Sequence, residues 1–151
     1  MTDIELRVGG KWKNFHETVT SEPAAHAVLH GGWGLRASSD WLRESGIAFE
    51  ELIAAALPGP RRISPFGAAY SFSDIIGTDG IALDTAGLGA MFKVRQEELF
   101  DSAKDPTHLA LVAGGVRLRE LMAWLAEHDL SLETTGSYDN QSLAWSAARI
   151  L

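Results

Sequence analysis

The pattern of apolar and polar residues predicts several short strands. Residues 4–8 alternate apolar and polar side chains in the manner of a half-buried strand, and two glycines follow as a turn. Residues 80–84 form another predicted strand. Residues 108–113 form the clearest one, because a continuous apolar run is typical of a strand buried on both faces. Residues 61–64 and 130–132 are shorter candidates.

Apolar residues at helical spacing predict two amphipathic helices, at residues 48–57 and 117–128. Their apolar faces consist of Phe49, Leu52, Ile53 and Ala56 in the first, and of Leu118, Leu121, Met122 and Leu125 in the second. A shorter helix begins at Trp41 after a polar cap at residues 38–40, and Gly46 is expected to interrupt it. The resulting order is strand, helix, three strands, helix, strand, which predicts an α+β or α/β layer fold.

Composition and charge limit the classes of protein to which this chain can belong. The 151 residues suit one compact domain or one piece of a larger fold. Thirteen Lys and Arg against twenty Asp and Glu give a net charge of −7, which argues against nucleic acid and anionic membranes as partners. The lack of cysteine excludes disulfides, thiolate metal sites and a cysteine nucleophile. No secretory signal or membrane-spanning run is visible, and we expect a cytoplasmic protein.

Three motifs suggest other chemistries but lack residues that those chemistries need. His26 and His30 have the spacing of two metal ligands on a helix, yet no third ligand is evident and glycines follow at once. Residues 87–92 begin like a dinucleotide fingerprint, but Phe92 replaces the third glycine, so we expect a turn before a helix. Residues 30–34 are similar to the oxyanion loop of some esterases, but the hydrolase interpretation also needs a nucleophile elbow, which this sequence lacks.

The loop at residues 65–73 offers a more specific chemistry. It follows a predicted strand, contains small residues where a ligand can come close, and ends in two hydroxyl side chains. Successive backbone N–H groups in such a turn can form a concave site for an anion such as a pyrophosphate. A plain surface turn has a similar composition, so the loop by itself leaves both interpretations open.

The loop and the motifs after it form a succession that resembles a known flavoprotein pattern. The succession is Pro65-x-Gly67-x-x-Tyr70-Ser71-Phe72-Ser73-Asp74, then Leu83-Asp84 and Leu88, then Val112 to Leu121, and finally Gly136-Ser137-Tyr138-Asp139-Asn140-Gln141-Ser142-Leu143-Ala144. It resembles the FAD-binding domain of the vanillyl-alcohol-oxidase type, in particular that of sugar-1,4-lactone and alditol oxidases. The resemblance is strongest over residues 61–144. It implies an N-terminal segment at 1–34 and, at 35–151, a partial FAD-binding domain with the α+β fold of the first PCMH-like subdomain.

The resemblance also implies a cofactor site. The residues that would line the FAD pyrophosphate are Phe66, Gly67, Ala68, Ala69, Tyr70 and Ser71, and those that would approach the rest of the cofactor are Gly136, Ser137, Asp139, Gln141 and Ser142. Relatives often carry Gly-His where this chain has Ala69-Tyr70, and that histidine is their usual covalent attachment point. A phenol cannot form a histidyl–flavin bond, so FAD is expected to be non-covalent at Tyr70.

The implied function is that of one component of an FAD-dependent oxidoreductase, which supplies the pyrophosphate-binding subdomain for oxidation of an alcohol-type substrate. No catalytic residue is assigned, because in the family those residues lie largely outside the part that this sequence resembles. Half of a dinucleotide cleft would expose apolar surface, so we expect a second polypeptide to complete the flavin and substrate domains, unless the chain is a truncated or repurposed piece. The alternative is a non-catalytic half-domain that acts as an assembly or interaction module.

Overall fold

The computed structural model describes residues 3–30, 38–56, 62–71, 74–101, 103–135 and 137–144. It has the mixed α and β composition that the sequence predicts. Its α-helices are α1 (Ser38–Ala56) and α2 (Leu118–Glu127), and two short 3-10 helices are η1 (Asp74–Ile76) and η2 (Gln96–Glu98). Its strands are β1 (Asp3–Val8), β2 (Trp12–Lys13), β3 (Thr20–Ser21), β4 (Ala25–His30), β5 (Ile63–Phe66), β6 (Ile81–Asp84), β7 (Met91–Lys93) and β8 (Ala110–Val112).

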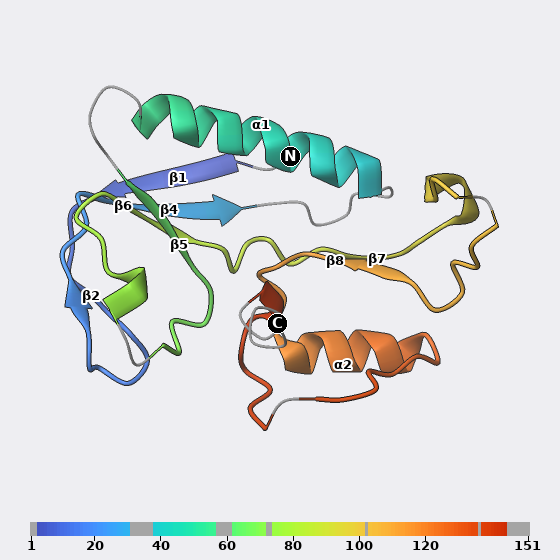
Figure 1. The fold of residues 1–151 in the computed structure, drawn as a ribbon. Helices are drawn as coiled ribbons and strands as arrows, with labels where there is room; N and C mark the ends of the chain where they lie inside the picture. The colour runs from blue at the N-terminus through green and yellow to red at the C-terminus, as the bar shows by residue number, and fades with distance from the viewer. Residues whose placement is uncertain are drawn as a thin grey trace.

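A four-stranded sheet in the order β1-β4-β6-β5 forms the larger part of the fold (Figure 1). β4, β6 and β5 run parallel to one another, whereas β1 is antiparallel to β4. α1 lies across one face of this sheet (Figure 1), and Leu52 of the helix and Leu29 of β4 are each only 1% exposed in the core between them. The parallel strands therefore end at the same edge of the sheet, where β5 and β6 run into loops.

β5 is an edge strand, and Pro65 lies inside it. The carbonyl of Phe66 accepts a hydrogen bond of 3.0 Å from the Thr85 N–H on the β6 side. Because successive residues of a strand direct their backbone groups to opposite sides, Pro65 turns its backbone away from the sheet. A proline is tolerated there, since its missing N–H removes no bond of the ladder.

The antiparallel pair β7–β8 and helix α2 form a second, smaller layer (Figure 1). Val116 and Leu121 are buried in its core, and Trp41 from the first turns of α1 packs into the same cluster. Leu88, in the turn between β6 and β7, packs against both hydrophobic cores. The predicted helix at 117–128 is confirmed, since α2 buries Leu118, Leu121 and Leu125.

The predicted interruption at Gly46 is wrong. α1 continues through Gly46 as one helix of 19 residues, and a Cβ atom built on this glycine would meet nothing within 4 Å. Packing of the apolar stripe outweighs the weak helix propensity of a single glycine. The predicted apolar face is also rotated, because Ala48 is buried whereas Ile53 is 50% exposed.

Several predicted strands differ from those observed. β8 is shorter than residues 108–113 and only partly buried, because it pairs with β7 alone and not with a central sheet. Residues 87–92 lead into β7 and not into a helix, and residues 130–132 form no strand. β5 begins later than predicted and extends to Phe66. β4, one of the two interior strands of the sheet, is not predicted from the sequence.

His26 and His30 lie on β4 and not on a helix. Four residues along a strand separate them by about 13 Å, which is too far for two ligands of one ion. His30 instead places its Nε2 at 3.1 Å from Glu5 Oε2 on the neighbouring strand. Hydrogen bonds from Arg7 and then His30 lower the pKa of Glu5 to about 2. Among the described residues there is no group of three side chains that could hold a metal ion.

Some predictions fall outside the described residues. They concern the glycine-rich run at 31–34, the last residue of the helix predicted at 48–57, residues 72–73 of the predicted loop, and Gly136. Within the described part of the chain, no helix is both long enough and apolar enough to cross a membrane.

Candidate functional site

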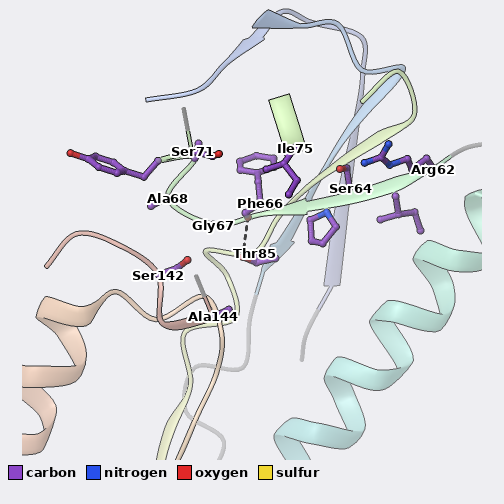
Figure 2. Close-up of a pocket in the computed structure, with 14 residues that line it drawn as sticks. Arg62, Ser64, Phe66, Gly67, Ala68, Ser71, Ile75, Thr85, Ser142 and Ala144 are labelled. Carbon is purple, nitrogen blue, oxygen red and sulfur yellow. Dashed lines mark hydrogen bonds between the residues drawn. The ribbon is translucent and has the colours of Figure 1, made fainter. Parts of the chain in front are cut away.

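A cavity of about 410 Å³ lies along β5 and the loop that follows it (Figure 2). The lining includes β5 itself and residues 67–71, which we call the cavity loop. Ile75, Thr85, Ser142 and Ala144 complete the lining together with Arg62. The cavity loop begins at the carboxyl end of a parallel strand, which is where open α/β sheets bind their ligands.

The start of the cavity loop is fixed by hydrogen bonds from the turn after β6. Thr85 donates its backbone N–H (3.0 Å) and its hydroxyl group (2.9 Å) to the carbonyl of Phe66, as Figure 2 shows for the second bond. Gly67 then passes beside Ser142, so closely that a Cβ atom built on this glycine would lie 2.2 Å from Ser142 Oγ. Only glycine fits at this point without displacing a neighbour.

The cavity loop presents backbone donors that the described part of the protein does not use. In the part of the chain that the structure describes, the N–H groups of Gly67, Ala68, Ala69 and Tyr70 donate to no protein group. Backbone N–H groups are nearly always paired with protein, water or ligand, so these donors are suited to an anion at the cavity. Ala69 adopts a left-handed backbone with φ of 52°, an unusual conformation for alanine.

The cavity carries little charge. Arg62 is the charged residue among the described residues of its lining, and Figure 2 shows it at the opposite end from Ser142. Within the described residues, an anion at the cavity loop would therefore be bound by backbone N–H groups and hydroxyls, with no cationic side chain beside it. The groups whose pKa is clearly shifted, such as Glu5 and Asp105, do not line the cavity.

Ser142 is placed by a segment that folds onto the start of α2. The N–H of Leu118 donates to the carbonyl of Gln141 (3.0 Å), and the N–H of Arg119 donates to that of Asp139 (2.9 Å). These bonds satisfy donors that a helix N-terminus otherwise leaves unpaired. The N-terminus of α2 is thus occupied by the protein's own backbone, and Ser142 is held 2% exposed against Gly67.

Tyr70 lies in an aromatic cluster that sequence reasoning missed. Its ring stacks on that of Tyr138, with 4.3 Å between centroids and 25° between planes. Phe15 and His16 from the N-terminal segment also contact it, at 4.8 Å and 4.5 Å between ring centroids. Tyr70, which is expected to line the FAD pyrophosphate, is therefore already packed by three rings from two distant segments.

The structure brings one group of predicted site residues together and leaves the other apart. Phe66, Gly67, Ala68, Ala69, Tyr70, Ser71 and Ser142 all line the same cavity. Ser137, Asp139 and Gln141 do not line it, and Gly136 lies outside the described residues. Sequence reasoning missed Thr85, because nothing local reveals that a threonine after β6 will bind a carbonyl 19 residues earlier.

Comparisons with known proteins show which proteins this chain is similar to. The chain is 37% identical over 98 residues to L-gulono-1,4-lactone dehydrogenase of two Mycobacterium tuberculosis strains, CDC 1551 / Oshkosh and ATCC 25618 / H37Rv. The match covers 65% of this chain and 21% of each relative, so the chain spans about a fifth of the length of these curated relatives. No protein-family model matches the chain.

Solved structures show the same fold. The cholesterol oxidase of Brevibacterium sterolicum superposes with a TM-score of 0.55 at 15% identity, over 93% of this chain and 23% of the oxidase. A mutant of that oxidase gives a TM-score of 0.56 at 17% identity. The resemblance to FAD-linked oxidoreductases of the vanillyl-alcohol-oxidase type, as a partial chain, is thereby confirmed, and so is the α+β fold class.

Proposed function

We propose that this chain is the pyrophosphate-binding subdomain of an FAD-dependent oxidoreductase that oxidises an alcohol-type carbon. One observation carries the proposal: the cavity loop aligns unused backbone donors beside a cavity, in a chain similar to a sugar-lactone dehydrogenase. When bound, the flavin accepts a hydride from the substrate, while the protein supplies binding and orientation.

The residues present fit a diphosphate. The N–H groups of residues 67–70 would bind its oxygens, and the absence of a side chain at Gly67 lets the backbone come close. The hydroxyl of Ser142 lies on the same side. A cavity of about 410 Å³ is within the range of ligand sites, but an entire FAD molecule extends beyond it. We propose that Ser137, Asp139 and Gln141 lie along the remaining part.

Tyr70 determines how the cofactor is held. A phenol cannot form the histidyl–flavin bond, so FAD bound here is non-covalent at this position. The stack of Tyr70 on Tyr138 provides a flat aromatic surface at the end of the cavity loop. We expect it to contact the cofactor by packing alone.

We propose that further protein completes the site, because an entire FAD molecule extends beyond the cavity. The chain corresponds to about a fifth of the lactone dehydrogenase, and we propose that a second polypeptide provides the remaining flavin and substrate domains. That second polypeptide would also cover the part of FAD that the cavity leaves outside.

A non-catalytic half-domain is the second candidate function. Ala69 favours it, because this residue holds a left-handed backbone that glycine, its usual counterpart in relatives, adopts without strain. Such a protein would keep the fold but not bind FAD, and would serve as an interaction module.

The test is flavin binding by the purified chain, alone and with any chain that copurifies. We expect FAD to shift its visible spectrum on binding and to be released by acid precipitation, because no covalent bond is formed. A well-folded chain that takes up no FAD, alone or with its copurifying partner, would refute the proposal and favour the half-domain. Flavin that stays attached to this chain in the acid pellet would refute non-covalent binding.

A further inference from the structure

Residues 12–21, which we call the strap, run along the cavity loop. The strap consists of β2, a turn and β3, and Figure 1 shows it in blue beside the green segment that follows β5. Strap residues contact the loop, as in the ring pair Trp12–Phe66 with 5.2 Å between centroids, yet none of them lines the cavity. The strap therefore lies behind the loop, on the side away from the cavity.

Two donors of the strap hold two carbonyls of the loop. The side-chain Nδ2 of Asn14 donates to the carbonyl of Ser71 at 2.6 Å, across 57 residues of sequence. The backbone N–H of Phe15 donates to the carbonyl of Ala69 at 2.8 Å. These bonds turn the carbonyls of Ala69 and Ser71 toward the strap.

The direction of a carbonyl fixes the direction of the next N–H group. In a trans peptide the C=O of one residue and the N–H of the following residue point to opposite sides of the chain. With the Ala69 carbonyl held by the strap, the Tyr70 N–H points away from the strap, and in the described part of the chain it donates to no protein group. The same bond helps to keep Ala69 at its unusual φ of 52°.

Asn14 is itself rigidly placed. It is 2% exposed, and its Nδ2 also donates to Thr18 Oγ1 at 2.8 Å. Its Oδ1 accepts a hydrogen bond from the Val19 N–H at 2.9 Å. Because the turn fixes the amide oxygen on one side, the amide nitrogen must face the loop.

We propose that the strap sets the polarity of the cavity loop, with carbonyls toward the strap and N–H groups toward a bound diphosphate, and that Asn14 is a positioning residue for this anion. The inference rests on the proposed function, since it assumes that the loop binds the FAD diphosphate. It adds an element from the N-terminal segment to that site, although the element touches no ligand.

The substitution Asn14→Asp tests the role of the amide, because it keeps the shape but replaces the donor by an oxygen. We expect FAD affinity to fall at least tenfold, measured by titration of flavin fluorescence. Gln96→Glu is the matched control, since Gln96 Nε2 also donates to a backbone carbonyl, that of Lys104, but in the distant β7–β8 hairpin. The control should stay within twofold of the original protein. A folded Asn14→Asp protein with unchanged FAD affinity would overturn the role of Asn14.

A second measurement needs no variant and is decisive even when Asn14→Asp does not fold. The amide NMR signal of Tyr70 in the unmodified protein should shift, and its solvent exchange should slow, when FAD or inorganic pyrophosphate is added. If FAD binds and the Tyr70 amide does not respond, the polarity inference fails while the proposed function stands. If the folded protein binds neither FAD nor pyrophosphate, alone or with its copurifying partner, both fail.

Discussion

The backbone at Gly67 lies too close to Ser142 to accommodate a side chain. A Cβ atom there would lie 2.2 Å from Ser142 Oγ and 2.8 Å from Ser142 Cβ, well inside van der Waals contact. Ser142 cannot retreat easily, because the flanking Gln141 and Leu143 are bonded to Leu118 and Val116. Any larger residue at Gly67 must displace the cavity loop itself.

We therefore predict that Gly67→Val lowers FAD affinity at least tenfold, which corresponds to about 1.4 kcal/mol. Titration with FAD, followed by flavin fluorescence, measures the effect. Gly46→Val is the matched control, because a side chain at Gly46 meets no neighbour within 4 Å. A double variant, Gly67→Ala with Ser142→Gly, should bind better than Gly67→Ala alone. Full FAD uptake by a folded Gly67→Val protein would instead show that the cavity loop does not hold the cofactor at Gly67.

Among the elements, α1 shows how packing overrides a local signal. Gly46 reads as a helix interruption, but the helix is stabilised along its length by contacts with the sheet. Gly46 nevertheless gives the unfolded chain extra conformational entropy, which lowers the free energy of unfolding. We predict that Gly46→Ala raises the free energy of unfolding by about 1 kcal/mol. Urea denaturation measures it, and a destabilised variant would show that Gly46 has a neighbour that the structure does not reveal.

The stability of the fold is expected to depend on pH through Glu5 of β1. The pKa of Glu5 lies at about 2 in the folded protein, below its ordinary 4.5, chiefly because Arg7 donates to its carboxylate. A lowered folded-state pKa means that the ionised form stabilises the fold above pH 4.5 and that this contribution is lost as the pH falls toward 2. NMR titration should show the low pKa, and Arg7→Gln should raise it. An unchanged value in Arg7→Gln would show that Arg7 is not the cause.

How far the elements are predictable depends on whether their signals are local. α2 was found because its leucines repeat at helical spacing, and the cavity loop because its small residues are contiguous. β4 was missed because Ala25 and Ala27 fill two of its three buried positions, and alanine has low strand propensity. The strap was missed because its contact with the loop joins residues 57 positions apart. Such long-range contacts depend on the topology of the fold and cannot be detected in a short window of the sequence.

The molecule as a whole consists of two packed layers that share Leu88. One core lies between α1 and the large sheet, and the other between α2 and the β7–β8 pair. Trp41 of α1 also reaches the second core. These shared residues join the two layers, so they should unfold together and not as separate units.

We predict that Leu88→Ala lowers the free energy of unfolding by about 2 kcal/mol, because it removes packing from both cores. Hydrogen exchange followed by mass spectrometry should then show faster opening in β6 and in α2 alike. Leu42→Ala serves as the control, because Leu42 is 53% exposed on α1 and should have little effect. Faster exchange in one layer alone would contradict the coupling.

Pro65 has a consequence for the behaviour of this protein at high concentration. An exposed edge strand is a template on which another chain can add its own strand, and this is how sheets grow into aggregates. At Pro65 the outward side of β5 has no N–H donor. An incoming strand would therefore form an interrupted ladder of hydrogen bonds. The edge beside the cavity is thus kept open to a small ligand while it resists extension into a fibril.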